Sequence, residues 1–301
     1  MNTIISNFIK YYFLVLRLLA LILHSFIRGD GKISAYFRKK IENFMIFSPR
    51  YYKFKKLPAE LKNSVMPLKI LTSDLVKLYC PFLKPKTDKM PVVVFYHGQS
   101  ENISKWQNTV FFLKNCGFGA AFPSFRGHYK SAGVPSEEGI YRDAKAVIEK
   151  LLSLGYDEKQ IFLWGRSLGS YPAIRAATEF GVGGVIVESG ISNIKSAGFS
   201  ILKLCPFILL KTFCKKILES ERFEQNFSNE KNIKNVKCDV LILHSLKDRK
   251  INFEQAEKLR EQNPEAELIL CKNGSHDTNE WCFEYVKSFI DKHYDQSKQD
   301  L

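Results

Sequence analysis

The stretch Phe162–Ala173, FLWGRSLGSYPA, contains the pentapeptide GRSLG, which has the form G-x-S-x-G with Ser167 at its centre. Alone, this pattern is a weak signal, because small residues around a serine are common. Its surroundings are more informative. The run Ile161–Trp164 has the pattern of a buried strand, and Tyr171–Ala177 is typical of the start of a helix. Strand, sharp turn and helix in this order indicate a nucleophile elbow, in which a serine side chain projects from the top of a sheet.

The elbow needs partners before its serine can act. Gly165 and Gly169 are the elbow glycines, whose small size lets the strained backbone close around Ser167. A tetrahedral intermediate requires an oxyanion hole of two backbone N–H groups. Leu168, which follows the serine, offers one, and Gln99, in the loop YHGQSEN after an all-apolar strand pattern, offers the other.

A serine hydroxyl also needs a general base, which a histidine most often supplies. The chain has six histidines: His24, His97, His128, His244, His276 and His293. His276 is the candidate base, because it lies in a loop just after the predicted strand Glu267–Cys271. His97 is expected to brace its loop through hydrogen bonds.

The acid that orients the base is predicted to follow the preceding strand. Asp248 lies just after the strand pattern Val240–His244, and the order serine, aspartate, histidine is the one expected for this arrangement. Asp277 and Asp143 are alternative acids, although neither follows a strand. The predicted catalytic residues are therefore Ser167, Asp248 and His276.

From about residue 60, strand and helix patterns alternate. The segment LKILTSDLVKLYCPF predicts an antiparallel pair that turns near Ser73 and Asp74. Further strands are expected at 91–96, 119–123, 161–164, 184–188, 240–244 and 267–271. Helices are expected at 104–115, 137–154, 168–181, 253–261 and 278–293. Such alternation predicts an α/β fold with a mostly parallel sheet and helices on both faces.

The interval 190–236 breaks this rhythm. It contains the apolar segment Phe199–Leu218, in which four lysines are interleaved. An insertion before the last strands lies above their carboxyl ends, where open sheets bind ligands. The segment is interpreted as a lid that lines an acyl-chain groove or contacts a membrane, with a helical excursion that only covers the core as the alternative.

The N-terminal residues have a different character. Residues 1–28 predict a hydrophobic membrane anchor, because Tyr11–Ile27 is apolar apart from a narrow stripe that includes Arg17 and His24. A soluble helix packed on the main domain is the alternative. Residues 29–59 read as a basic linker, whose excess of lysine and arginine would keep the following domain cytoplasmic. Residues 1–56 are the expected contact with anionic lipids, and 296–301 form a polar tail.

Composition narrows the class of protein. The chain has 301 residues and a net charge of +14, with 45% hydrophobic residues. A positive charge of this size favours binding to an anionic surface, such as nucleic acid or acidic lipid. The sequence has no recognisable nucleic-acid-binding module, so nucleic acid is not an expected partner. The seven cysteines are scattered and contain no C-x-x-C pair, which argues against a disulfide framework or a zinc site and favours a reducing compartment.

Four stretches resemble the α/β-hydrolase superfamily: YHGQSEN, FRGHYKSAGVPSEEGIYRDA at 125–144, WGRSLGS, and ILHSLKD with GSHD. More narrowly, they resemble serine-aminopeptidase-like hydrolase-domain proteins, a group that includes membrane-associated depalmitoylases and lysophospholipase-like enzymes. The resemblance covers residues 60–295 and excludes the N-terminal 60.

The resemblance implies an α/β-hydrolase fold over 60–295, and places the nucleophile, acid and base on Ser167, Asp248 and His276. Gln99 and Leu168 would be the oxyanion donors. Together with the residues, it predicts a serine hydrolase that cleaves an ester or thioester, in an acyl lipid or an acylated protein, without metal or organic cofactor. A peptidase or amidase of the same fold, and a non-catalytic membrane-associated binding protein, are the alternatives.

Overall fold

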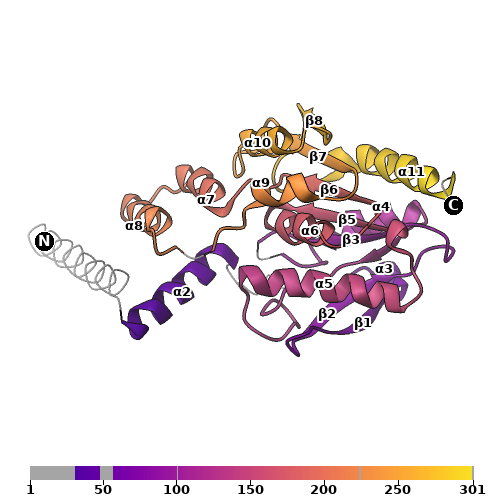
Figure 1. Ribbon diagram of the computed structural model, residues 1–301, viewed down its shortest axis with the longest axis horizontal. Helices are drawn as coiled ribbons and strands as arrows, with labels where there is room; N and C mark the ends of the chain where they lie inside the picture. Colours follow the sequence, from indigo (N-terminus) through magenta and orange to yellow (C-terminus); the bar gives the residue numbers. More distant parts are fainter. Residues whose placement is uncertain (1–30, 48–56, 100, 224, 300–301) are drawn as a thin grey trace, which may run out of the picture.

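A computed structural model describes residues 31–47, 57–99, 101–223 and 225–299. Its centre is an eight-stranded sheet in the order β1-β2-β4-β3-β5-β6-β7-β8 (Figure 1). The strands are β1 (Val65–Leu71), β2 (Lys77–Leu83), β3 (Val92–Tyr96), β4 (Gly119–Ala121), β5 (Ile161–Arg166), β6 (Gly184–Glu188), β7 (Val240–Ser245) and β8 (Glu267–Cys271). The α-helices of the described residues are α2 (Lys32–Phe47), α3 (Ala59–Ser64), α4 (Gln107–Asn115), α5 (Glu137–Ser153), α6 (Ser170–Ala177), α7 (Ile194–Lys203), α8 (Ile208–Glu219), α9 (Asn229–Asn232), α10 (Glu254–Gln262) and α11 (Phe283–Gln299).

The sheet is parallel from β4 to β8 and antiparallel at its β1 edge. The predicted antiparallel pair is confirmed as β1 and β2. Their turn is closed by Thr72, whose hydroxyl lies 2.6 Å from a carboxylate oxygen of Asp74. The predicted α/β fold with a mostly parallel sheet is therefore confirmed.

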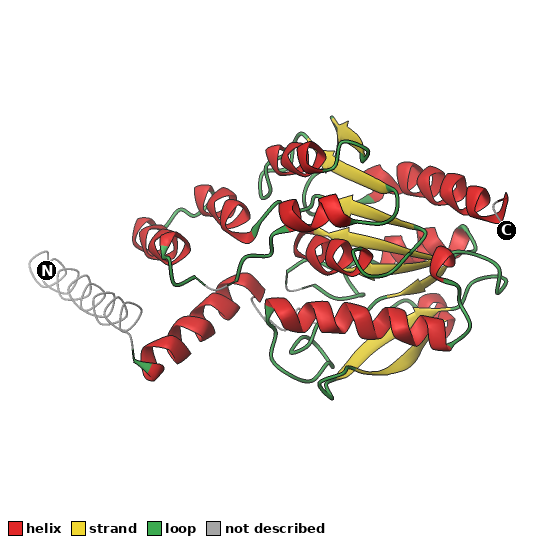
Figure 2. Cartoon of the chain, in the orientation of Figure 1, coloured by secondary structure: helices red, strands yellow, loops and turns green. Residues whose placement is uncertain are grey.

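Helices cover both faces of the sheet (Figure 2). Successive strand side chains point to opposite faces, so each strand contributes to two cores. Val94 of β3 belongs to the core shared with α5, α6 and α10, whereas Val93 belongs to the core shared with α3, α4 and α11. The strands β3, β5, β6 and β7 are buried along their whole length, as expected for strands covered on both sides.

Several predicted boundaries were wrong for local reasons. The helix predicted from Ser104 begins at Gln107, because the Asn102 side chain accepts the Ser104 N–H and holds a turn there. The helix predicted at 168–181 is α6, which begins at Ser170 after a 3₁₀ turn and ends at Ala177.

The ends of strand β4 and of the last helix also differ from the predicted bounds. Strand β4 stops at Ala121 rather than at Pro123, a residue that has no N–H to donate. The last helix, α11, runs from Phe283 to Gln299, so it extends into the segment predicted as a polar tail.

The interval 190–236 contains the helices α7, α8 and α9 between β6 and β7. Figure 1 shows α7 and α8 projecting at one end of the molecule, on the side where α2 also lies. The two helices approach closely, since a Cβ at Gly198 would lie 2.7 Å from a methyl carbon of Leu218. Phe207 and Ile208, at the start of α8, are 68% and 78% exposed.

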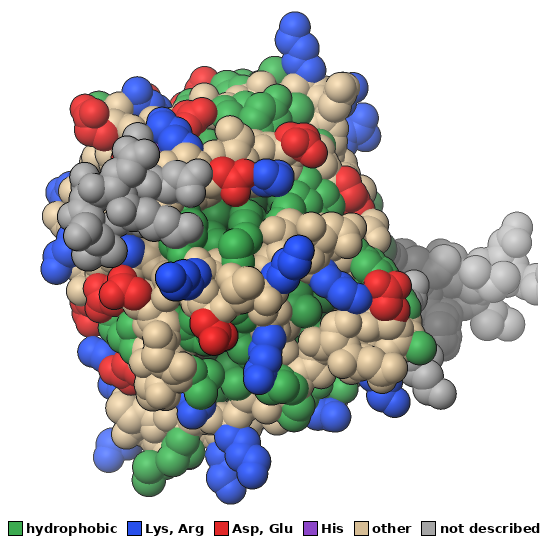
Figure 3. All heavy atoms as spheres, turned by 90° about the vertical axis from the view of Figure 1, so that its right-hand side faces the viewer, with side chains coloured by type: hydrophobic (Ala, Val, Ile, Leu, Met, Phe, Trp, Pro, Cys, Tyr) green, Lys and Arg blue, Asp and Glu red, His purple; other side chains and the backbone are tan. Residues whose placement is uncertain are grey.

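The opposite end of the molecule has a mixed surface. Figure 3 shows lysine and arginine side chains interspersed with acidic ones around apolar patches on that face. The net positive charge is therefore not gathered there into a patch of a single sign.

The segment predicted as a basic linker contains helix α2, which ends in the buried residues Ile46 and Phe47. The predicted anchor, residues 1–28, lies outside the described residues. Within the described part of the chain, no helix combines the length and apolar character needed to cross a bilayer.

Candidate active site

Ser167 lies at the junction of β5 and α6, where the backbone has a positive φ of 51°. This left-handed conformation is strained for a residue with a side chain. Both predicted elbow glycines are sterically required. A Cβ at Gly165 would lie 2.5 Å from the Gly169 carbonyl oxygen, and a Cβ at Gly169 would lie 2.1 Å from the Tyr96 carbonyl oxygen. The turn closes tightly against β3 and presents Ser167 to a cavity.

Asp248 and His276 meet at the carboxyl ends of β7 and β8. His276 Nδ1 lies 2.7 Å from Asp248 Oδ2. The other carboxylate oxygen accepts the N–H groups of Lys250 and Ile251, each at 2.9 Å. Because an ionised carboxylate only accepts hydrogen bonds, the proton lies on Nδ1 and leaves Nε2 of His276 as a free acceptor.

The two alternative acids lie elsewhere. Asp277 pairs with Lys250 at 2.5 Å and is largely exposed. Asp143 is buried, and its carboxylate accepts hydrogen bonds from the backbone N–H and the guanidinium Nε of Arg126, both at 2.8 Å. Asp248 is thus the one of the three candidate aspartates that contacts His276.

The environment keeps His276 neutral and Asp248 ionised near neutral pH. Burial lowers the pKa of His276, and the positive charge of Arg166 lowers it further, against the opposing effect of Asp248. Burial alone would raise the pKa of Asp248, but the hydrogen bond and charge of His276 and the Ile251 N–H hold it below its usual value. This is the ionisation state of a general base with its orienting acid.

Gln99 and Leu168 line the same cavity as Ser167. A hydrogen bond within the Gln99 loop fixes its backbone, because the N–H of Gly98 donates to Glu101 Oε2 at 2.9 Å. His97 braces the loop as predicted, with Nδ1 2.7 Å from the Gly98 carbonyl oxygen. Burial lowers the pKa of His97 to about 4, so its ring stays neutral.

Among the described residues, neither the Ser167 hydroxyl nor His276 Nε2 makes a hydrogen bond. Hydrogen bonds of this kind are often long in proteins without substrate and tighten in the reactive complex. The residues brought to one edge of the sheet are therefore a hydroxyl, a neutral imidazole bonded to a carboxylate, and two candidate backbone donors.

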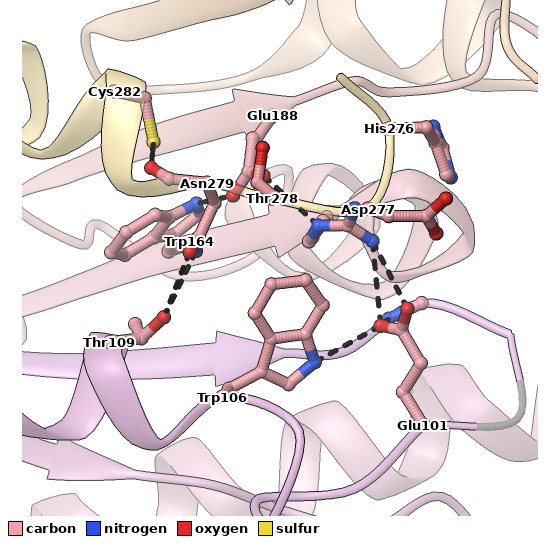
Figure 4. A network of polar contacts seen from close by, with 12 residues as sticks. Glu101, Trp106, Thr109, Trp164, Glu188, His276, Asp277, Thr278, Asn279 and Cys282 are labelled. Atoms are coloured by element: carbon pink, nitrogen blue, oxygen red, sulfur yellow. Dashed lines mark hydrogen bonds and ion pairs between the residues drawn. The ribbon is translucent and has the colours of Figure 1, made fainter. Parts of the chain in front are cut away.

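A buried ionic network supports this edge, and the sequence did not reveal it. Arg166 is fully buried and pairs with Glu188 at 3.0 Å and with Glu101 at 3.3 Å. Its guanidinium lies 4.2 Å from the ring centroid of Trp106, whose indole N–H donates to Glu101 at 3.1 Å. Figure 4 shows Glu101 and Trp106 on one side of the network and Glu188 with Trp164 on the other.

The network also has an electrostatic effect. Burial raises the pKa of Glu188 to about 7, although Arg166 and the Trp164 N–H oppose the shift. Glu101, which is closer to solvent and also bonds Lys105 at 2.5 Å, has a lowered pKa. The one sign of this network in the sequence was the charged residue Arg166 inside the pentapeptide GRSLG. Its partners Glu101 and Glu188 are distant in the chain, so the sequence did not predict them.

The cavity that begins at Ser167 has a volume of about 270 Å³. Apart from Ser167 and Gln99, the side chains around it are apolar or sulfur-containing. They come from α2, α7, α8 and neighbouring loops, and are Met45, Ile46, Leu168, Ile191, Ile194, Ala197, Ile201, Leu202, Cys214, Leu218, Phe223 and Ile251. The described residues contain no cluster of three or more His, Cys, Asp or Glu side chains that could hold a metal ion.

Comparison with known proteins identifies the superfamily of this chain. A family model described as serine aminopeptidase, S33, matches residues 87–226. An uncharacterized membrane protein of Saccharomyces cerevisiae is 30% identical over 206 residues, which are 65% of this chain and 67% of that protein. The chain belongs to the α/β-hydrolase superfamily.

Particular relatives are also similar. Protein ABHD12B of Homo sapiens is 30% identical over 184 residues, which cover 58% of this chain and 50% of that protein. The lysophosphatidylserine lipase ABHD12 of Bos taurus is 27% identical, over 56% of this chain and 44% of the lipase. The chain thus spans about half the length of these two relatives.

The solved structure of the esterase Pf2001 of Pyrococcus furiosus superposes with a TM-score of 0.69. It is 21% identical in sequence and covers 82% of this chain and 97% of the esterase. At this identity, the likeness establishes the fold alone.

Proposed function

We propose that this α/β-hydrolase is a serine hydrolase that cleaves an ester or thioester of an acyl chain through an acyl-enzyme intermediate. The observation that carries the proposal is that Ser167 lines an apolar cavity. A serine hydroxyl beside an apolar cavity is suited to attack the carbonyl carbon of a chain that fills the cavity.

The residues divide the reaction as follows. His276 Nε2 takes the proton of Ser167 as the serine oxygen attacks the carbonyl carbon. The N–H groups of Leu168 and Gln99 hold the oxyanion that forms. The bond to the leaving oxygen or sulfur then breaks, and His276 returns the proton to that alcohol or thiol. A water molecule, deprotonated by His276, then attacks the carbonyl carbon of the acyl-enzyme. The bond from that carbon to Ser167 Oγ breaks, His276 returns the proton to Ser167, and the carboxylic acid leaves.

Asp248 orients His276 and stabilises the imidazolium that forms in each step. Its short bond to Nδ1 supports this role, because it fixes the tautomer in which Nε2 is free. The buried network of Arg166, Glu101 and Glu188 holds the loop that carries Gln99.

The α/β-hydrolase domain comprises residues 60–295 in this proposal, and the helices of 190–236 act as a lid over the cavity. The lining of the cavity by α7 and α8 supports the lid. A membrane anchor at residues 1–28, with the catalytic domain on the cytoplasmic side, would bring the site to acyl lipids or acylated proteins. The name of the bovine lipase supports a lipid ester as substrate.

A fluorophosphonate probe tests the nucleophile. The full chain is expected to be labelled, and labelling is expected to be lost in Ser167→Ala and in His276→Ala. Hydrolysis rates over acyl esters, acyl thioesters and acyl amides then define the substrate. A well-folded chain that is not labelled would refute the serine mechanism, and faster cleavage of the amides would favour a peptidase or amidase.

A further inference from the structure

Helix α2, which lies outside the segment that resembles the hydrolase family, makes direct contact with the candidate oxyanion loop. The side-chain nitrogen of Gln99 donates to the carbonyl oxygens of Met45 and Ile46, each at 2.7 Å. These are among the last residues of α2. The residue whose backbone N–H is the proposed oxyanion donor is thus tied through its side chain to the end of a helix.

The chemistry of this contact favours a stable link. The last four carbonyl groups of an α-helix have no partner within the helix and carry partial negative charge. An amide NH₂ with two protons can satisfy two of them. The Gln99 loop is then held on both sides, by α2 through the Gln99 side chain and by Glu101 through the Gly98 N–H.

The end of α2 is itself fixed to the domain. Phe47 is fully buried and packs against Phe227, with ring centroids 5.8 Å apart. The Phe47 carbonyl oxygen lies 3.2 Å from His128 Nε2, and Gln225 donates to the Asn43 side chain at 2.7 Å. The helix end is therefore a rigid support for the loop.

The same helix end also forms part of the cavity wall. Met45 and Ile46 line it together with Ile201 and Leu202 of α7. Ile46 is 5% exposed. The shape of an apolar cavity decides how long a hydrocarbon chain it admits, because a filled wall excludes added methylene groups.

We propose that the C-terminal end of α2 is a working part of the active site, which limits the length of the acyl chain and holds Gln99 as a positioning residue. The inference rests on the proposed function and adds to it a substrate-selecting wall from outside the family segment. It assigns the chain-length limit to Ile46 and the fixing of the oxyanion loop to the Gln99 side chain.

Chain-length profiles of the full chain test the wall. We expect Ile46→Trp to raise the ratio of kcat/KM for a two-carbon ester to that for a twelve-carbon ester by at least about tenfold. Ile46→Ala is expected to lower this ratio. Ile33→Ala, on the exposed start of α2, is the matched control and should leave the ratio unchanged. An unchanged ratio in both Ile46 variants would overturn the assignment.

A second pair of variants tests the positioning role. Gln99→Met keeps the size of the side chain but removes both donors, and we expect kcat to fall about tenfold with KM for a short ester within twofold. Gln99→Lys retains a donor suited to a helix C-terminus and is expected to restore most of kcat. Gln160→Met removes a glutamine side chain that donates to the Asp88 carbonyl oxygen and does not contact α2, so it is the control and should leave kcat unchanged. Full kcat in Gln99→Met would refute the role.

Melting temperatures and fluorophosphonate labelling of each variant show that it is folded. These outcomes separate the two proposals. A parent chain that is labelled and active, with Ile46 and Gln99 variants that behave like it, contradicts only the role of α2. A folded parent chain that is neither labelled nor active contradicts the serine hydrolase itself.

Discussion

The backbone at Ser167 is held in the left-handed region, with φ at 51°. A left-handed residue with a Cβ is strained by about 1–2 kcal/mol, and the surrounding elbow retains this strain. Ser167 lines the cavity in this conformation. Stability at this one residue is given up for the direction of its side chain.

This strain predicts a trade-off between stability and activity. Ser167→Gly should be more stable than Ser167→Ala by about 1 kcal/mol, because glycine relieves the strain that alanine retains. Both variants should lack fluorophosphonate labelling. Denaturant unfolding of the pair measures the difference. Equal stability of the two would show that the left-handed conformation carries no strain.

Substitution of the carboxylate tests the predicted acid. Asp248→Asn is expected to lower kcat by about 10³–10⁴-fold, because an amide can donate to Nδ1 and stabilise the wrong tautomer of His276. Asp277→Asn is the matched control, since Asp277 binds Lys250 and not the imidazole. Steady-state kinetics on one short ester compare them. A larger loss in Asp277→Asn would assign the acid to that residue.

The pH dependence follows from His276, which must be neutral to accept the serine proton. Burial and Arg166 lower its pKa from the ordinary value of 6.5. The value of kcat/KM should therefore fall to half of its plateau only at a pH below 6.5. A pH profile of the free enzyme reports this value. A half-point above pH 6.5 would contradict the lowered pKa.

At the scale of elements, the site is assembled from loops at the carboxyl ends of β3, β5, β7 and β8. Parallel strands bring these ends to one edge of the sheet, although the residues lie far apart in the chain. The elbow between β5 and α6 packs directly on β3, because Gly169 lies against the Tyr96 carbonyl group.

That contact predicts the effect of one added methyl group. In Gly169→Ala, the new Cβ would overlap the Tyr96 carbonyl oxygen, so β3 or the elbow must move. We expect a loss of about 3 kcal/mol in the free energy of unfolding, together with a slower reaction with the probe. The φ of Gly169 is −65°, so alanine adds no left-handed strain at this position. Gly31→Ala, where a Cβ meets nothing within 4 Å, is the control for the added methyl group. Equal losses in the two variants would show that the contact with β3 is not the cause.

The strands were predictable because their periodicity is a local property. Strands β6 and β8 match their predicted bounds, and the other predicted strands differ by one to three residues at an end. The helix boundaries were less predictable. The bond from Asn102 to the Ser104 N–H delays α4, and such a side-chain contact is not visible in a hydrophobic pattern.

For the whole molecule, the net charge and the N-terminal residues lead us to expect binding to a membrane. The chain carries a net charge of +14, and both α2 and α8 have exposed apolar side chains. Vesicles of neutral lipid with about a third of anionic lipid should retain the full chain. If residues 1–28 insert, binding persists at about 1 M salt, where the Debye length is near 3 Å. Release by salt would indicate binding by surface charge alone, and no binding at low salt would refute the membrane contact.

The candidate site was only partly predictable, because sequence patterns report interactions between residues that are close in the chain. Ser167, Asp248 and His276 follow predicted strands, so topology places them at one edge. Helix α2 was missed, although apolar residues at Ile33, Ile41 and Met45 recur at helical spacing. Its lysines and arginines indicated a linker, and nothing in the pattern said that its end would meet the Gln99 loop.

The sequence by itself determined the order of the strands and of the helices α4, α5, α6, α10 and α11, the turn at Ser167, and the residue types at the ends of the strands. These depend on interactions between residues close in the chain. The tertiary structure alone decided that the end of α2 meets the Gln99 side chain, and that Arg166 is buried between Glu101 and Glu188. Contacts of this kind join residues that are distant in sequence, and packing selects them from many chemically equivalent pairs.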